Sequence, residues 1–413
     1  MPVAVWVLGF AIFAQGTSEF LLAGLLEAMA RDLHVSVPTA GLLISAYAVG
    51  MVVGAPVLAM ATLRWPRRKA LLLFLVIFAA AHVVGALTPG YGVLFASRLV
   101  GAIACAGFFG VAAVTAVDLV PVEVRARALA VVIGGITVAT VLGVPAGTFI
   151  GQYLGWRAAF WAVAGLTVPA IAGVALTLPR RSRPAPDARA GTPQPAMREQ
   201  VRDELRSMRR PALWVAYGTT ALSFSSMMAT FGYLGPLLTG PGGLGDRWVP
   251  AVLALFGVGS LAGIAIGGRV ADAHPFGTLY AGLGGVVAAS AGIALTARHP
   301  VAVIVLVFLM GVAGMATNPA VNVRVHATAG PARTLAGASV TSAFNVGNAL
   351  APWLGGLVVS AGFGYASVPW VGAVMATGAL ATVVWASRLE RARKAASPPV
   401  RRNPEPAATE RAA

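Results

Sequence analysis

The sequence predicts an all-α integral membrane protein with twelve membrane-spanning helices in two six-helix bundles. Three observations support this fold class. Of the 413 residues, 58% are hydrophobic and only 11% are charged, whereas a soluble domain carries about 25% charged residues. Apolar runs of about 20 residues, long enough to cross a bilayer as helices, recur along the whole chain. A longer polar stretch in the middle divides these runs into two groups of six.

The twelve predicted spans cover residues 5–27, 39–62, 70–88, 91–119, 128–150, 158–178, 212–238, 249–270, 276–297, 299–321, 334–360 and 365–387. An even number of spans places both termini on one side of the membrane. Most of the 30 Lys and Arg residues fall in the connections on that same side. Because basic residues favour the cytoplasmic side, we expect a multi-pass membrane protein with cytoplasmic termini. The net charge of +16 therefore reflects membrane topology and does not indicate nucleic-acid binding. Arg greatly outnumbers Lys, and Ala and Gly are abundant, which indicates a GC-rich bacterial genome and hence the bacterial plasma membrane.

We predict an N-terminal bundle over 1–178, a cytoplasmic linker over 179–211, a C-terminal bundle over 212–388 and a disordered basic tail over 389–413. Within the linker, the helical spacing of Val201, Leu205 and Met208 favours an amphipathic helix along the membrane face.

The two halves share a weak repeat. Gly50 and Gly54 in span two correspond to Gly259 and Gly263 in span eight, with an aromatic residue three positions before each pair. Two six-span repeats indicate a transporter whose site lies between the halves, near the middle of the bilayer.

Glu19 is the most informative single residue, because apolar sequence flanks it on both sides. A carboxylate within hydrocarbon is costly unless it is paired, protonated or facing water, so it is a functional candidate by default. We predict that Glu19 carries a proton. Arg98 in span four lies at a similar depth, which makes the two candidates to meet. The alternative is a buried ion pair that only fixes helix packing.

Other polar residues within the spans are weaker candidates. His82 in span three is a second candidate for proton coupling, although a lone His in a span is more often a packing residue. Asn345 and Asn348 share one helix face, and Gln15 and Asn318 also need polar partners in lipid. For these amides, contact with substrate and hydrogen bonding between helices are both open.

Span five contains Gly143, Pro145 and Gly147. Small residues allow helices to approach closely, and Pro145 interrupts the backbone hydrogen-bond ladder and bends the helix. The sequence has no Walker-type loop and no metalloprotease or hydrolase motif, so an ion gradient is the remaining energy source. We expect no cofactor and no metal. Cys105 is the single cysteine, which excludes a disulfide within the chain.

The sequence resembles the major facilitator superfamily, in its twelve-span drug:proton antiporter group. The resemblance covers nearly the whole chain outside the middle loop and the tail. Its motifs are Gly16-Thr-Ser-Glu19-Phe-Leu-Leu-Ala-Gly24, Arg31-Asp-Leu, Ala40-Gly-Leu-Leu-Ile-Ser-Ala-Tyr47, Ser97-Arg98-Leu-Val-Gly101, Gly143-Val-Pro145, Gly155-Trp156-Arg157 and Asn345-Val-Gly347-Asn348. Within that group it is most similar to actinobacterial chloramphenicol exporters.

The resemblance implies antiport of a proton inward against a drug outward, by alternating access of two halves in a protein that we expect to be monomeric. It implies a proton-carrying role for Glu19, a coupling role for Arg98 and an antiporter bend at Gly143 and Pro145. We assign the substrate-binding surface to six residues: Gln15, Glu19, Tyr47, Asn318, Asn345 and Asn348. Close relatives in the wider group export sugars or nucleosides, which is the nearest alternative. A multi-span membrane enzyme would need more acids, His or nucleophiles at one depth than the spans offer.

The predicted cytoplasmic gating loops depart from the family pattern. Arg64, Arg67 and Arg68 are present, but Leu63 occupies the place of the usual Asp in the first half. The second half keeps Asp272 but lacks the basic residues that usually follow. We therefore expect the charge clamp of the first half to be weaker or rebuilt with other partners.

Overall fold

The computed structural model describes residues 1–62, 65–179, 210–271, 273–329 and 333–396. These ranges contain helices and no strand, and eleven of the helices are long and apolar enough to cross a membrane. The twelfth long helix of the bundles is α10 (Pro211–Gly232), whose buried face carries several Ser and Thr side chains. The predicted fold class is confirmed.

The N-terminal half comprises α1 (Val3–Phe20), η1 (Leu21–Gly24), α2 (Leu26–Asp32), α3 (Val37–Ala61), α4 (Arg67–Leu87), α5 (Tyr91–Asp118), η2 (Val122–Val124), α6 (Arg125–Val138), η3 (Ala139–Gly143), α7 (Val144–Leu154) and α8 (Trp156–Thr177). The C-terminal half comprises α10, α11 (Leu234–Thr239), η4 (Asp246–Trp248), α12 (Val249–Val270), α13 (Pro275–Leu295), α14 (Pro300–Ala329), α15 (Arg333–Val358), η5 (Val359–Phe363), η6 (Tyr365–Ser367) and α16 (Val368–Ala396).

The last helix corrects one predicted boundary. We ended the C-terminal bundle at 388 and expected disorder from 389, but α16 continues to Ala396. The physical reason is composition, since Leu, Glu, Arg, Lys and Ala after residue 388 are strong helix formers. Most of the predicted linker (180–209), including its expected amphipathic helix, lies outside the described residues. So do Arg64, Asp272 and the rest of the tail (397–413).

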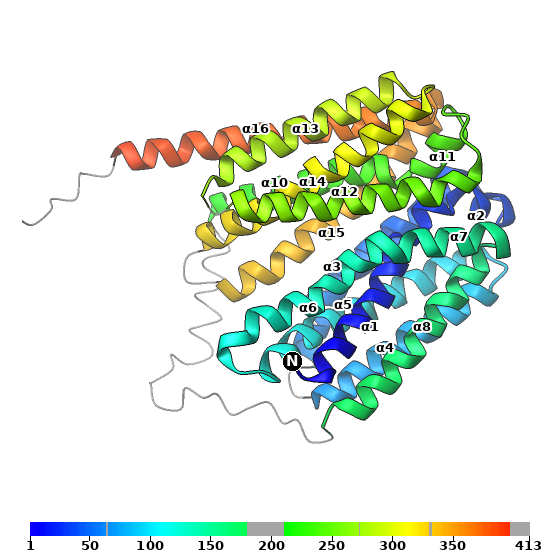
Figure 1. Cartoon of the computed structure of the whole chain (residues 1–413), viewed down its shortest axis with the longest axis vertical. Helices are drawn as coiled ribbons and strands as arrows, with labels where there is room; N and C mark the ends of the chain where they lie inside the picture. Colours follow the sequence, from blue (N-terminus) through cyan, green and yellow to red (C-terminus); the bar gives the residue numbers. More distant parts are fainter. Residues whose placement is uncertain (63–64, 180–209, 272, 330–332, 397–413) are drawn as a thin grey trace, which may run out of the picture.

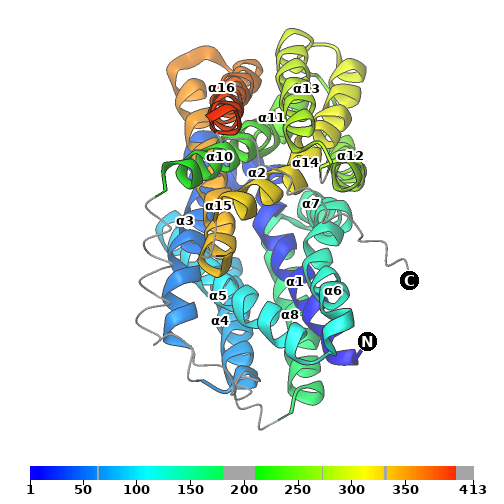
Figure 2. The same cartoon turned by 90° about the vertical axis from the view of Figure 1, so that its left-hand side faces the viewer.

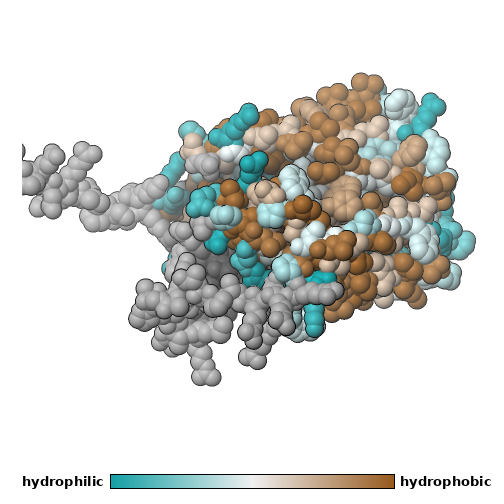
Figure 3. Space-filling view, turned by 60° about the horizontal axis from the view of Figure 1, so that its bottom comes forward, coloured by the Kyte–Doolittle hydropathy of each residue, from teal (hydrophilic) through white to brown (hydrophobic). Residues whose placement is uncertain are grey.

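The flank of the molecule is apolar. Large hydrophobic side chains such as Leu176, Leu295 and Val374 are at least 70% exposed. Brown, apolar side chains cover much of the face in Figure 3, and teal, hydrophilic ones gather toward its ends. In a bilayer these side chains contact lipid, which explains why apolar residues occur on all sides of the helices.

Glycines allow neighbouring helices to pack backbone against backbone. On α12, a side chain at Gly259, Gly263 or Gly267 would collide with the backbone of α14. On α3, Gly50 and Gly54 approach α5 in the same manner. The glycine pairs that the sequence repeat matched therefore have the same packing role in both halves.

The two halves form separate groups of helices that approach each other at one end (Figures 1 and 2). We call this end, formed by α2, α11 and η4, the outer end, because it is the end that we predict to face outside. Helix α3 packs against α15, and α12 packs against η3 and α7. The contacts between α3 and α15 include a hydrogen bond of 2.8 Å from Ser45 Oγ to the Ala349 carbonyl oxygen. Toward the opposite end the ribbons of the two halves diverge (Figure 1).

Candidate functional site

Glu19 lies near the end of α1, where this helix faces the C-terminal half. Its side chain is only 8% exposed. Asn348 of α15 donates a hydrogen bond of 3.2 Å from Nδ2 to Glu19 Oε1. The predicted proton carrier is therefore hydrogen-bonded to a residue of the other half, 329 positions away in the sequence.

Arg98 is held beside Glu19 by a chain of hydrogen bonds. Its Nη1 donates to Ser18 Oγ over 2.7 Å, and Ser18 Oγ lies 2.6 Å from His82 Nε2. His82 Nδ1 lies 2.8 Å from the Phe78 carbonyl oxygen, which can only accept. Nδ1 therefore carries the proton, and Nε2 accepts from the Ser18 hydroxyl. Every link of this chain has one donor and one acceptor, so the arrangement fixes the guanidinium against α1.

The ring of Tyr47 packs against the guanidinium group of Arg98. The guanidinium carbon lies 4.2 Å from the ring centroid, a cation–π contact that compensates part of the cost of burying the charge. Both side chains are almost fully buried. Tyr47, which we assigned to the substrate surface, thus contacts the coupling arginine in this conformation.

Glu19 and Arg98 do not form an ion pair. Ion pairs within the described part of the chain include Arg67 with Asp118 and Arg157 with Asp32. Nevertheless, Arg98 lies close enough to Glu19 for their charges to attract each other. Ser18, next to Glu19 in the chain, is what physically connects the two candidates. Sequence reasoning did not single out Ser18, although a polar Thr-Ser-Glu triplet inside an apolar run was the available signal.

Several buried polar atoms around Glu19 lack a hydrogen-bond partner among the described residues. They are both amide atoms of Gln15, Nε and Nη2 of Arg98, and Oδ1 of Asn345. Gln15 is fully buried one helical turn from Glu19. An unpaired buried polar group costs about 1–3 kcal/mol, so these atoms are suited to bind a substrate or waters when the site opens.

The predicted amide residues differ in position. Asn345 and Asn348 lie one turn apart on α15, and Asn345 Nδ2 donates to the Thr341 carbonyl oxygen over 3.0 Å. Asn318 accepts from Asn322 within α14. Its neighbour Ala316 packs against Gly267, close to the end of α12 that is opposite the outer end. The structure thus brings Asn345 and Asn348 toward Glu19 and leaves Asn318 elsewhere.

The two glycines of the span-five motif lie against α1 and η1. A side chain at Gly143 would collide with Thr17, and one at Gly147 would collide with Leu21. The π-helical turn η3 ends at Gly143, directly before the first turn of α7 that contains Pro145. Because proline cannot donate to the ladder, this interruption is where the helix accommodates it. The motif therefore positions the segment of α1 that carries Glu19.

The predicted gating residues that are described pair within the N-terminal half. Arg67 of α4 forms its ion pair with Asp118 at the end of α5, and Arg68 Nη2 donates to the Ala175 carbonyl oxygen over 2.6 Å. In place of the missing Asp at position 63, the acidic partner of Arg67 is Asp118.

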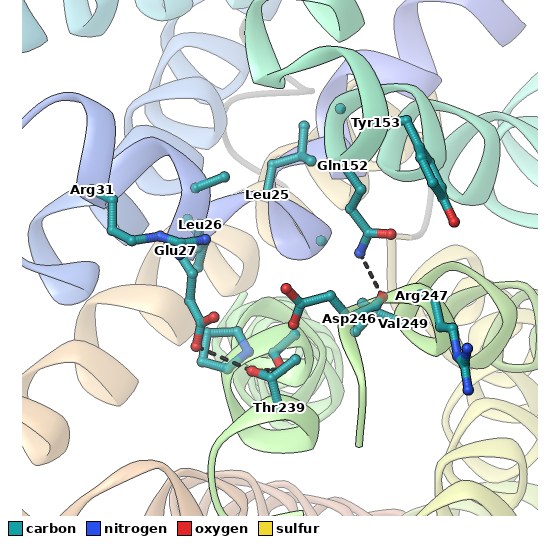
Figure 4. A pocket seen from close by; sticks show the side chains of 15 residues that line it. Leu25, Leu26, Glu27, Arg31, Gln152, Tyr153, Thr239, Asp246, Arg247 and Val249 are labelled. Carbon is teal, nitrogen blue, oxygen red and sulfur yellow. Dashed lines mark hydrogen bonds between the residues drawn. The ribbon is translucent and has the colours of Figure 1, made fainter. Parts of the chain in front are cut away.

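At the outer end, a pocket of about 270 Å³ lies between the halves. Glu27, Gln152 and Asp246 are among the residues that line it, and the carboxylates of Glu27 and Asp246 point inward (Figure 4). The Thr239 hydroxyl shares its one proton between the Gly235 carbonyl oxygen of its own helix, at 3.1 Å, and Glu27. Two hydrogen bonds cross between the halves here: Thr239 Oγ1 donates to Glu27 over 3.2 Å, and Gln152 Nε2 donates to the Asp246 carbonyl oxygen over 2.8 Å. We call these two bonds the outer latch. Sequence reasoning missed these residues because they lie at or just beyond the ends of the predicted spans and belong to no motif.

Between the outer pocket and Asn348, apolar side chains close the interface. The cavity that remains beside Phe20, Phe231 and Asn348 has a volume of about 10 Å³, enough for at most one water molecule. In this conformation the described residues beside this cavity leave no room for a drug-sized molecule.

The Gly155-Trp156-Arg157 motif fastens the outer end of the N-terminal half. Arg157 and Trp156 both donate to the Asp32 carboxylate, which holds the pKa of that carboxyl below its usual range. Gly155 has φ = 85°, a conformation that favours glycine, and it joins α7 directly to α8.

Comparison with known proteins gives consistent matches. The family model described as Major Facilitator Superfamily matches residues 8–298 and 248–412. A chloramphenicol resistance protein of Streptomyces lividans is 44% identical over 85% of this chain and 88% of its own length. The inner membrane transport protein YdhP of Escherichia coli is 36% identical over 92% of this chain and 95% of its own. A crystal structure of a bacterial homologue of the human lysosomal transporter Spinster, inward-facing and unoccupied, superposes with a TM-score of 0.74 at 18% identity, covering 93% of this chain and 96% of that one.

Proposed function

Because this chain belongs to the Major Facilitator Superfamily, and is therefore a multi-pass membrane transporter, we propose that it exports chloramphenicol or related phenicols in exchange for protons. The similarity to the chloramphenicol resistance protein of S. lividans supports the choice of substrate. The resulting activity would be drug efflux that confers antibiotic resistance. In this proposal both termini lie in the cytoplasm.

The hydrogen bond between Glu19 and Asn348 is the observation that carries the proton-coupling part of the proposal. It joins α1 of one half to α15 of the other. An ionised Glu19 accepts strongly from Asn348 and is attracted by Arg98, whereas a protonated Glu19 accepts more weakly from Asn348 and loses the attraction by Arg98. The charge of one buried carboxylate thus changes the free energy of contact between the halves, which is what coupling requires.

The neighbouring groups support exchange between proton and drug. Chloramphenicol is neutral and carries hydroxyl, amide and nitro groups, which match the unpaired amide atoms of Gln15 and Asn345. When the halves separate around Glu19, these atoms become available to the drug. A single carboxylate then serves the proton and the substrate in turn.

The test is chloramphenicol accumulation in a susceptible bacterium that expresses the protein, with and without an uncoupler. We expect low accumulation that the uncoupler raises to the level of cells lacking the protein. Unchanged accumulation despite good expression would move the substrate to a sugar, nucleoside or other metabolite. Transport by purified protein in liposomes then separates these classes, because sugar efflux without phenicol efflux refutes the proposed substrate.

The outer latch leads to a prediction about conformation. Combining Thr239→Val with Gln152→Leu removes both hydrogen bonds, each worth about 0.5–1.5 kcal/mol, and should favour opening at the outer end. The measurement is labelling by a membrane-impermeant thiol reagent at Ala23→Cys, in a chain whose single native cysteine is replaced by alanine. Ala23 is 1% exposed, so labelling reports opening, and we expect it to be several-fold faster in the double variant.

Thr239→Ser is the matched control, since it keeps the hydroxyl that donates to Glu27. Labelling at the parental rate is expected for this variant. Equal labelling rates in the double variant and the control would mean that the two bonds do not hold the outer end closed.

A further inference from the structure

A second pocket lies at the end of the C-terminal half opposite the outer end. It has a volume of about 320 Å³ and is formed by the start of α13 and the ends of α14 and α16. Helix α13 packs against both α14 and α16, and Figure 1 shows the three helices together. Nothing in the proposed transport mechanism uses this pocket.

Arg324 is the central side chain of the pocket. Its guanidinium lies 3.9 Å from the ring centroid of Phe276, which fixes its position. Its Nη1 is buried and has no hydrogen-bond partner among the described residues. The Glu390 carboxylate lines the same pocket and attracts the Arg324 guanidinium, but it is not a hydrogen-bond partner of Nη1. A buried donor without an acceptor is costly, so Nη1 is suited to bind a further acceptor.

The charges of the pocket specify the kind of acceptor. Arg324 and Arg391 contribute two positive charges and Glu390 contributes one negative charge, which leaves a net charge of +1. The backbone at the start of α13 adds a partial positive charge, since no side chain caps this 21-residue helix. A group with a single negative charge and several acceptor oxygens, such as a phosphodiester, matches this balance.

The surroundings favour a lipid over a soluble anion. The walls include the apolar side chains of Phe276 and Val323. On α16, Trp385 and Leu389 are 55% and 42% exposed and lie within two turns of Arg391. The pocket therefore lies where an apolar flank meets a basic end, which is the level of lipid headgroups on the side that we predict to be cytoplasmic.

We propose that this pocket binds the headgroup of an anionic phospholipid, with the phosphodiester on Arg324 and Arg391. Phosphatidylglycerol, whose phosphodiester carries a single negative charge, is a lipid of this kind. Lipid bound there ties α13, α14 and α16 together, and so stabilises the C-terminal half.

The test uses the purified full-length protein in detergent and follows its thermal unfolding midpoint during titration with short-chain phosphatidylglycerol. We expect the midpoint to rise as lipid is added. Arg324→Gln should raise the half-saturating lipid concentration by about tenfold or more, which is the effect of one lost charge-assisted hydrogen bond. Arg388→Gln is the matched control. It removes one positive charge from an exposed part of α16 that does not line the pocket, and should leave the lipid effect unchanged.

Further titrants identify the source of the anion. Phosphatidylcholine of the same chain length and inorganic phosphate should each leave the midpoint near its starting value. An equal shift with phosphatidylcholine, or equal weakening by Arg324→Gln and Arg388→Gln, would overturn the headgroup assignment. An equal shift with inorganic phosphate would assign the pocket to a soluble anion instead.

If Arg324→Gln does not fold, Arg391→Gln at an exposed position takes its place, and an undiminished lipid effect in that variant refutes the proposal.

Discussion

Glu19→Gln is expected to abolish uncoupler-sensitive export and to return chloramphenicol accumulation to the level of cells without the protein. Glutamine keeps the size of the side chain, and its carbonyl oxygen still accepts from Asn348. It cannot take up and release a proton or change the attraction by Arg98. The variant therefore removes the proposed coupling while leaving the contact between α1 and α15 in place, and its thermal stability should stay close to that of the parent.

The matched control is Glu27→Gln, which neutralises another carboxylate two helical turns farther along the same part of the chain. Glu27 lies in the outer pocket and is half-buried, so this variant should retain uncoupler-sensitive export. Proton movement in liposomes that contain purified protein provides a second measurement. Chloramphenicol added to these liposomes should drive proton flux with the parent and with Glu27→Gln, but not with Glu19→Gln.

Retention of uncoupler-sensitive export by Glu19→Gln would assign the proton to another group. His82 is the next candidate from the sequence, but both of its ring nitrogens are already engaged and its ring lies 4.2 Å from that of Phe78. In the arrangement seen here, His82 orients Ser18 and through it Arg98. We therefore propose a positioning role for His82.

Gly135→Val is expected to have the largest effect on stability. Its side chain would collide with the Gly9 carbonyl oxygen of α1, and a backbone atom cannot move aside as a flexible side chain can. Overpacking typically costs about 1–3 kcal/mol, and a collision with backbone belongs at the upper end. The yield of monodisperse protein in mild detergent and the unfolding midpoint should both fall sharply.

Gly134→Val is an unusually close control, because it places the same β-branched residue one position earlier in the same helix. Apart from the backbone of its own helix and its chain neighbours, no atom lies within 4 Å of a Cβ added at Gly134, so the yield and unfolding midpoint of this variant should stay near the parental values. Equal losses in both variants would indicate an effect of helix propensity instead of contact with α1. Since α1 carries Glu19, this contact between α1 and α6 also determines where the carboxylate lies.

The sequence by itself determined the number of spans and the repeat between the halves, and it identified Glu19 as the leading candidate for proton coupling. Each follows from a local property. A bilayer requires about 20 apolar residues in a row, so spans are visible without knowledge of their neighbours. A carboxylate within such a run is equally conspicuous. The glycine pairs at Gly50 and Gly54 and at Gly259 and Gly263 were also visible, because helix packing in membranes selects small residues wherever backbones approach.

Only the tertiary structure decided which groups meet. The bond from Asn348 to Glu19, the bridge from Arg98 through Ser18 to His82, and the outer latch each depend on how helices are rotated and how they cross. In hydrocarbon these angles are determined by contacts along whole helix faces, such as that of Gly135 with Gly9 and of Gly143 with Thr17, and not by any single residue. The sequence gives the depth of a residue along its helix, so Glu19 and Arg98 could be predicted to lie at one depth. The side of the helix to which each side chain points depends on the neighbouring helices, so only the tertiary structure shows the hydrogen-bond partners of these two residues.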